Sequence, residues 1–238
     1  MQPSRLDHLV VVSSTLDEGV QWCEHHLGVQ PGPGGQHPLM GTHNRLLNIA
    51  SPAFPNAYLE IIALDPSAIP TRAPGLRRWF DMDDDRLMAR VRSHGPELAH
   101  WVARTEDVDH AVHQLRATHI EPGAVLQASR MTPAGLLQWK ITVRDDGQRL
   151  FDGMLPTLIE WGERHPTERM ESRGVMLERL VLKHPQPQAL QAALRAVALH
   201  ETACFHIEPG EAGLVAEFQV AGARRTISTS PGSPHWST

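Results

Sequence analysis

Short runs of hydrophobic residues recur along this chain in a regular order. Residues 6–12 form an apolar, β-branched run of strand length. From Leu16 to Leu27 the apolar residues keep helical spacing, and Gly28 follows as a stop signal. Further strand patterns lie at residues 45–50 and 57–64, with a short strand expected before them. The first part of the chain therefore predicts a β-α-β-β-β unit.

The same order of patterns returns in the middle of the chain. A strand at residues 99–104 precedes a helical pattern at residues 108–117, and strands follow near residues 125–129, 136–143 and 155–161. Similar units of similar length indicate an internal duplication.

A third pass begins at Met176, with a strand, a helical pattern and three more strands. These patterns predict an α+β fold of paired βαβββ modules with an additional third βαβββ-like module. The expected parts are a first module at residues 5–64, a linker with a helix at 65–97, a second module at 98–163 and a third, partial structural module at 175–230. Within the linker we expect a helix over residues 76–91, with the acidic run 81–85 on its exposed side.

Composition narrows the class of protein. The 238 residues are 41% hydrophobic and 21% charged, as in an ordinary soluble globular protein. A net charge of −5 without clustered Lys and Arg argues against nucleic-acid binding. Two distant cysteines make no disulfide framework, and no run approaches the ~20 apolar residues of a membrane span. We therefore expect a cytoplasmic protein with no membrane contact.

The first two units each carry a His in their opening strand and a Glu in their last. Glu60 follows His8 by 52 positions, and Glu160 follows His100 by 60. Alternation along a strand gives each side chain apolar neighbours on one face, where an unpaired carboxylate is costly. Compensation through a shared divalent cation is one account. In the alternative, each His bonds to backbone and each Glu pairs with an Arg.

The repeat therefore predicts a metal site formed by His8, Glu60, His100 and Glu160. Two His and two Glu suit Zn²⁺, Ni²⁺, Mn²⁺ or Fe²⁺. The ion would polarise a carbonyl or stabilise an enediolate oxygen, while Glu60 or Glu160 moves a proton. In the third unit Arg179 stands where the His is expected, so that unit is interpreted as structural.

Three stretches of the first unit resemble a known family: Gly34-Gly35-Gln36-His37, the run from Met40 to Leu46, and Tyr58-Leu59-Glu60. Over residues 5–165 the chain resembles the vicinal oxygen chelate superfamily, and within it the glyoxalase-like domain proteins. The resemblance implies the glyoxalase/bleomycin resistance/dioxygenase fold, in which paired modules form a cupped sheet around a metal. It also implies the same four ligands, although members with this domain often lack one or more of them.

Several polar and aromatic residues are candidates for substrate contacts. Asn44, Arg45 and Arg104 could bind a polar or anionic substrate, but a tight turn or a salt bridge accounts for them equally well. The aromatic residues Trp101, Trp139 and Trp161 could line a pocket, although core packing is the preferred interpretation. The sequence His165-Pro166 is interpreted as a turn.

Three functions remain open from the sequence. The first, implied by the resemblance, is a glyoxalase-like metal-dependent lyase or isomerase that acts on a small oxygenated substrate through an enediolate. The second is an Fe²⁺ extradiol-type dioxygenase with His8, His100 and Glu160 as its ligands. The third is a metal-free small-molecule binding or sequestration protein, favoured if an Arg or Gln fills the centre of the cup. An unpaired sheet edge in the third unit makes a homodimer possible.

Overall fold

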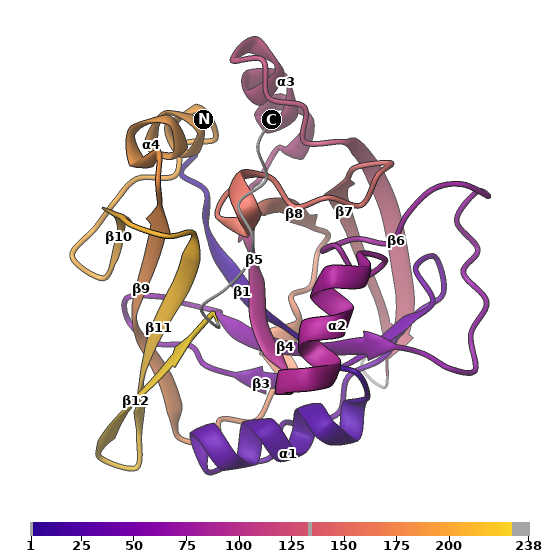
Figure 1. Cartoon of the computed structure of the whole chain (residues 1–238), viewed down its shortest axis with the longest axis vertical. Helices are drawn as coiled ribbons and strands as arrows, with labels where there is room; N and C mark the ends of the chain where they lie inside the picture. Colours follow the sequence, from indigo (N-terminus) through magenta and orange to yellow (C-terminus); the bar gives the residue numbers. More distant parts are fainter. Residues whose placement is uncertain (1, 133–134, 230–238) are drawn as a thin grey trace.

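The computed structural model describes residues 2–132 and 135–229, which form two β-sheets and the helices packed on them (Figure 1). The larger, curved sheet has the strand order β2-β3-β4-β1-β5-β8-β7-β6, and the smaller has the order β10-β9-β11-β12. The strands are β1 Arg5–Val12, β2 Gln36–His37, β3 Thr42–Asn48, β4 Tyr58–Leu64, β5 Glu97–Arg104, β6 Ala124–Thr132, β7 Gly135–Val143, β8 Thr157–Trp161, β9 Val175–His184, β10 Phe205–Pro209, β11 Gly213–Val220 and β12 Ala223–Ser228. The helices are α1 Leu16–Leu27, α2 Asp85–His94, α3 Val108–Ala117 and α4 Pro187–Ala196, with 3₁₀ turns η1 Phe151–Gly153 and η2 Pro166–Arg169.

The two halves of the large sheet share one strand arrangement. In the first half β1 pairs in parallel with β4, and in the second half β5 pairs in parallel with β8. The halves meet where β1 and β5 pair antiparallel at the centre of the sheet. The predicted α+β class and the paired β-α-β-β-β order are therefore both present.

The C-terminal sheet differs from these halves. Its elements follow the expected order, but β9 pairs in parallel with β10, the strand directly after its helix, and antiparallel with β11. In the large sheet the opening strand of each half pairs in parallel with the last strand of that half. The expectation of a third module of the same kind is therefore not confirmed, because element order alone does not fix strand pairing.

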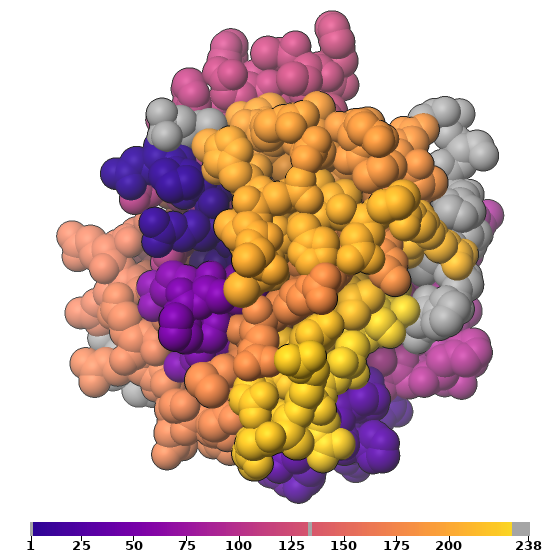
Figure 2. Space-filling model, turned by 90° about the vertical axis from the view of Figure 1, so that its left-hand side faces the viewer, coloured from indigo at the N-terminus to yellow at the C-terminus, as the bar shows by residue number. Residues whose placement is uncertain are grey.

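The large sheet separates two hydrophobic cores. On its convex face Leu9, Val11 and Trp101 pack against α1, α3 and the C-terminal sheet. Figure 2 shows the C-terminal segment, coloured orange to yellow, spread over that side of the molecule. On the concave face, which we call the cup, Val10 and Val102 pack against α2. None of the helices in the described part of the chain has both the length and the apolar character that a membrane span requires.

Local signals in the sequence set the ends of α1 and α2. The Thr15 side chain accepts a hydrogen bond from the Glu18 amide at the start of α1, and Gly28 ends it with φ of 70°. The linker helix begins at Asp85, later than predicted, because Asp84 caps it. The acidic run therefore forms the turn before α2 and not the exposed side of a longer helix.

Two aromatic residues of the linker, Trp79 and Phe80, enter the cup, and we call them the aromatic wedge. Their rings stack at 5.2 Å, and both side chains are buried. Phe80 and Asp81 have φ of 58° and 59°, a left-handed backbone that non-glycine residues adopt only at a cost. Arg149 holds the Asp81 carboxylate through its Nε at 2.7 Å and its amide at 3.2 Å. The Arg149 contacts thus fix the linker at the point where the wedge enters the cup.

Candidate functional site

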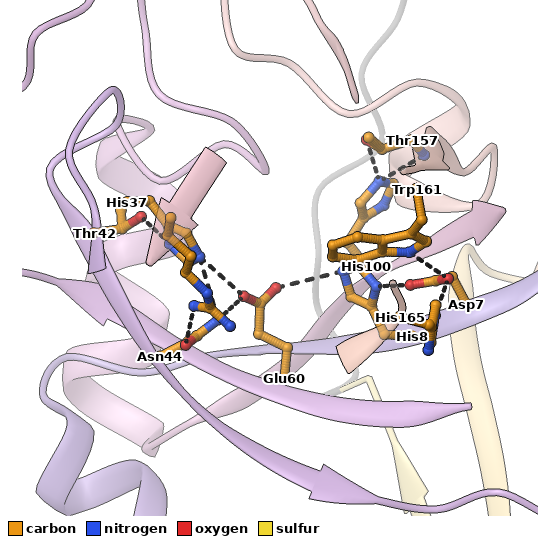
Figure 3. A network of polar contacts seen from close by, with 11 residues as sticks. Asp7, His8, His37, Thr42, Asn44, Glu60, His100, Thr157, Trp161 and His165 are labelled. Atoms are coloured by element: carbon orange, nitrogen blue, oxygen red, sulfur yellow. Dashed lines mark hydrogen bonds and ion pairs between the residues drawn. The ribbon is translucent and has the colours of Figure 1, made fainter. Parts of the chain in front are cut away.

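A cavity of about 30 Å³ lies in the cup beneath the first half of the sheet. Its polar lining consists of His8, His37, Asn44, Glu60 and Arg130, and its walls include Tyr58, Trp79, Phe80, Trp139 and Trp161. Figure 3 shows Glu60 between His37 and Asn44 on one side and His8 on the other. The cavity therefore combines ionisable groups with an aromatic enclosure, as small-molecule sites do.

A bulge in β1 places Asp7 beside the imidazole of His8. The register of β1 on β5 shifts between Leu6 and His8, so Asp7 is left without a partner on β5. Its Oδ1 lies 2.7 Å from His8 Nδ1. The carboxylate thereby fixes which nitrogen of His8 faces the cavity, namely Nε2.

The second oxygen of Asp7 is held by residues of the second half, Trp161 on β8 and His165 just after it. Trp161 Nε1 donates to Asp7 Oδ2 at 2.9 Å, and His165 Nε2 lies 3.0 Å from the same oxygen. His165 also caps η2, where its Nδ1 accepts from the Thr167 amide. The buried Asp7 therefore has a hydrogen-bond partner for each oxygen, which accounts for its burial without a Lys or Arg.

Glu60 on β4 faces His8 across the cavity. The distance from His8 Nε2 to Glu60 Oε2 is 3.5 Å, longer than an ordinary hydrogen bond. Asn44 Nδ2 donates to Glu60 Oε1 at 2.6 Å, and His37 Nε2 lies 4.0 Å from that oxygen. Glu60 Oε1 is therefore tightly bound by Asn44, whereas Glu60 Oε2 has only a long contact with His8, which a ligand could replace.

These contacts change the protonation of the site. Burial alone would lower the pKa of His8, but the hydrogen bonds and charges of Asp7 and Glu60 raise that pKa to about 9. Burial would raise the pKa of Glu60, but His8, with smaller contributions from His37 and Asn44, lowers it to about 2. The pKa of Asp7 is lowered too, because its hydrogen bonds to His165 and His8 outweigh burial. At neutral pH the site thus holds an imidazolium between two carboxylates.

His37 is neutral by contrast. Burial lowers its pKa to about 4, its Nδ1 lies 3.0 Å from Thr42 Oγ1, and its Nε2 lies 3.3 Å from Asn44 Nδ2.

Asn44 fits here because Gly34 has no side chain: a Cβ on Gly34 would lie 2.1 Å from the backbone carbonyl oxygen of Asn44. The Gly-Gly pair seen in the sequence therefore makes room for the polar side of the cavity.

The corresponding His of the second half lies in a different environment. The His100 ring bonds through Nδ1 to Gly153 O at 2.9 Å and through Nε2 to Thr157 Oγ1 at 3.0 Å. Phe80 of the aromatic wedge packs against it with ring centroids 5.3 Å apart. Burial, with a contribution from the charge of Arg149, lowers the pKa of His100 to about 3. His100 is therefore a neutral, fully hydrogen-bonded residue behind the wedge.

Strand register explains why Glu160 is not beside His100. In the first half His8 pairs with Tyr58, so Val10, two residues after His8, pairs with Glu60. In the second half Val102, two residues after His100, pairs with Thr157. The position that corresponds to Glu60 is therefore Thr157. Glu160 comes three residues later and points to the other face of β8. There it contacts Lys140 Nζ at 3.0 Å and accepts from the Val108 amide at 2.9 Å, at the start of α3.

The predicted four-ligand metal site is therefore not assembled. Only His8 and Glu60 meet, because the wedge isolates His100 and register turns Glu160 outward. Across residues 2–132 and 135–229 no group of three or more His, Cys, Asp or Glu side chains is placed to hold a metal. The three ligands proposed for an extradiol dioxygenase, His8, His100 and Glu160, lie apart for the same reasons. The donor set does not fit the predicted metal centre, and metal binding itself stays a prediction.

The predicted substrate contacts divide between the cup and the surface. Asn44 lines the cavity, but Arg45, its neighbour on β3, is exposed because side chains alternate along a strand. Arg104 lies in an open groove at the outer end of the sheet. Trp101 is in the convex core as preferred, and Trp139 and Trp161 pack in the cup core while also lining the cavity.

Three residues that the sequence did not single out as functional reach this site: Asp7, His165 and Arg130. For Asp7 and His165 no pattern was available, since a bulge and a cap bring them together. Arg130 did have a signal, because it follows Leu126 and Ala128 on the inward face of β6, and those two residues pack on the cup core.

Several solved structures of other proteins match this chain at low sequence identity. A crystal structure of a hypothetical protein from Staphylococcus aureus matches with 15% identity and a TM-score of 0.61, over 94% of this chain and 98% of that one. Methylmalonyl-CoA epimerases match more distantly. A variant of the Streptomyces coelicolor enzyme has 18% identity and a TM-score of 0.40, over 68% of this chain and 96% of that one. The Mycobacterium tuberculosis enzyme has 17% identity and a TM-score of 0.37, over 66% of this chain and 86% of that one. No curated protein matches the sequence significantly.

The family model for the glyoxalase-like domain matches residues 6–198, most of the chain, including both halves of the large sheet. This agrees with the resemblance seen in the first unit of the sequence. The chain belongs to the glyoxalase-like domain family.

Proposed function

We propose that the protein is a lyase or isomerase of the glyoxalase type that moves a proton next to the carbonyl of a small oxygenated substrate. The observation that carries this proposal is the buried contact between His8 and Glu60 at the wall of the cavity. An ionised carboxylate and an imidazolium, side by side in an aromatic enclosure, are the two partners that such a proton transfer needs.

Each group has a defined task. Glu60 is ionised at neutral pH, and its Oε2 accepts a proton from the carbon next to the carbonyl. His8 donates through Nε2 to the carbonyl oxygen, where negative charge develops as the C–H bond breaks. His8 keeps its proton in this hydrogen bond, and in an isomerisation Glu60 returns its proton to carbon as the carbonyl re-forms, so Glu60 is ionised and His8 protonated again at the end. Asp7 acts through His8, because it keeps Nδ1 occupied and Nε2 directed at the cavity.

The glyoxalase-type chemistry expected from the sequence includes a divalent metal. Only His8 and Glu60 of the predicted ligands are in contact, so no step of this proposal is routed through an ion. Metal content of the purified protein, measured by plasma mass spectrometry, tests the prediction directly. About one transition metal per chain that is lost in both His8→Ala and Glu160→Ala would restore the four-ligand site and contradict the present assignment.

Hydrogen–deuterium exchange at carbon tests the proton transfer. The protein is incubated in D₂O with 2-oxoaldehyde–thiol adducts, 2-oxo acids and 2-hydroxy aldehydes, with and without added Zn²⁺, Ni²⁺, Mn²⁺ or Fe²⁺, and loss of the C–H signal is followed by NMR. We expect Glu60→Gln to lower the exchange rate by about 100-fold or more. Glu160→Gln is the matched control, the same change outside the cup, and should exchange at the wild-type rate.

Exchange by Glu60→Gln at the wild-type rate would refute the assigned base. No exchange of any compound, with or without metal, would favour the second candidate function, a protein that binds a small molecule without turning it over. The guanidinium of Arg130 at the cavity supports that candidate, since an Arg inside the cup is what a metal-free binding protein would carry.

A further inference from the structure

The guanidinium of Arg130 lies in the cup, and no carboxylate within residues 2–132 and 135–229 pairs with it. Among the described residues, its hydrogen bond is the one from Nη1 to Asn44 Oδ1 at 3.4 Å, and its Nε is buried with no acceptor. A buried donor on a cationic group that lacks an acceptor is costly, unless a ligand supplies one.

A second donor at the same cavity also lacks a partner. The indole of Trp79 is 6% exposed, and its Nε1 has no hydrogen-bond acceptor in the described structure. Trp79 and Arg130 both line the cavity that contains His8 and Glu60. Most buried polar groups in proteins are hydrogen-bonded, so two unpartnered donors at one cavity indicate a site for a ligand with acceptor oxygens.

The backbone makes room for the guanidinium. A Cβ on Gly35 would lie 2.4 Å from Arg130 Nη1, so a larger residue there would displace the Arg130 head group. The neighbouring Gly34 admits Asn44 in the same way. The glycine pair therefore accommodates both polar side chains on this side of the cavity.

Charge and size limit what the ligand can be. Glu60 already places one carboxyl group at the cavity beside Arg130, so a ligand with a single carboxylate is favoured over a dicarboxylate, which would bring a second carboxylate into the same buried place. The cavity of about 30 Å³ has room for roughly two water-sized groups, which suits the two oxygens of one carboxylate.

We propose that Arg130, with Trp79 Nε1, forms a subsite for the carboxylate of a small 2-oxo monocarboxylate. Arg binds a carboxylate through two parallel hydrogen bonds, which fixes the orientation of the ligand. The 2-oxo oxygen then lies toward His8. This proposal rests on the proposed function for the role of His8, but the carboxylate subsite is tested by binding alone.

Pyruvate is the probe, with pyruvamide as its uncharged counterpart. Binding is followed by calorimetry and by the indole Nε1–H resonance of Trp79 in ¹⁵N-labelled protein, assigned with Trp79→Phe. We expect pyruvate to bind and shift that resonance, and pyruvamide and a dicarboxylate such as oxaloacetate to bind more weakly. The variant Arg130→Gln should weaken pyruvate binding about 10- to 100-fold, and Arg130→Lys less, because charge remains without the fork.

The matched control is Arg225→Gln, the same change at an exposed position of β12 in the other sheet, which should bind pyruvate as the wild type does. Far-UV and near-UV circular dichroism establish that each variant is folded. Equal pyruvate affinity in folded Arg130→Gln and wild type, or no pyruvate binding by the wild type, would overturn the subsite.

Failure of the subsite and failure of the proposed function give different results. Glu60→Gln should still bind pyruvate, since it removes a negative charge and leaves Arg130 in place. Arg130-dependent binding without Glu60-dependent exchange would keep the subsite and refute the enzyme. Glu60-dependent exchange with unchanged pyruvate affinity in Arg130→Gln would keep the proposed enzyme and refute the subsite.

Discussion

The two halves of the large sheet present the same position of the fold in two chemical forms. In the first half His8 is a cation held between Asp7 and Glu60. In the second half His100 is neutral and bonded to a backbone carbonyl and to Thr157. The two carboxylates beside His8, against a carbonyl and a hydroxyl beside His100, separate a protonated imidazole from a neutral one.

The comparison also explains how duplication can leave one site where two are expected. Strand order is shared by the halves. What differs is the β1 bulge that brings Asp7 to His8, the side chain on the last strand, and the aromatic wedge, from which Phe80 packs on His100. The ionisable pair on which the proposed function rests therefore belongs to the first half.

Removing each imidazole is the strongest test of this difference. His8→Gln leaves two buried carboxylates without their cation, and we expect it to cost about 3–5 kcal/mol of unfolding free energy. His100→Gln disturbs only neutral hydrogen bonds and should cost about 1–3 kcal/mol. Urea denaturation at pH 6 measures both. Equal costs would mean that the charged network of the first half is not formed.

The pH dependence of stability sharpens the same comparison. The pKa of His8 is about 9 when folded, against an ordinary 6.5, so its contribution is full below pH 6.5 and is lost as pH rises toward 9. The pKa of Glu60 is about 2 against 4.5, so its contribution is present above pH 4.5 and is lost as pH falls toward 2. Burial lowers the pKa of His37 and His100 to about 4 and 3, so their contribution is also lost as pH falls below 6.5, and stability should be highest near pH 6.5. His8→Gln should remove most of the alkaline decrease, seen in denaturation midpoints.

Thr157→Glu is designed to break the difference between the halves. It introduces a carboxylate beside His100 Nε2, the contact that Glu60 makes with His8, and should raise the pKa of His100 by about one to three units. Titration of the His100 ring by NMR measures the change, with the His8 ring in the same sample as the internal reference. A His100 pKa that stays near 3 in the folded variant would show that the wedge, and not the missing carboxylate, keeps this half neutral.

Glu160→Gln should have the smallest effect. Its partly exposed contact with Lys140 and its bond at the start of α3 together contribute about 1 kcal/mol or less. Neither lies in the cup, so the His8 resonance should not move. A shift of that resonance, or loss of bound metal in this variant, would support the four-ligand site predicted from the sequence.

Much of the frame follows from the sequence because its signals are local. Strand β1 and helix α1 begin and end as the apolar run, the helical spacing and Gly28 predict. His8 and Glu60 were also accessible, since they belong to one half and one contiguous pattern. The pairing partner of β9 was not, because strand pairing depends on contacts distant in sequence.

The second half of the site required information that spacing does not carry. Glu160 follows His100 by 60 positions, but the structural counterpart of Glu60 is Thr157, which follows His100 by 57. Alignment of the two units by residue type matches Glu60 with Glu160, whereas alignment by strand register matches Glu60 with Thr157. Asp7 was inaccessible for a related reason, since a bulge is a property of two paired strands. Arg130 could have been found by counting every second residue from Leu126.

The central position of β1 has a consequence for how the chain is made. This apolar strand leaves the ribosome well before its two neighbours β4 and β5, which end at Leu64 and Arg104. Both of its edges stay open until those segments have been synthesised, and open apolar edges invite pairing between nascent chains. The strand that carries His8 therefore depends on uninterrupted translation from β1 to the end of β5 for both of its partners.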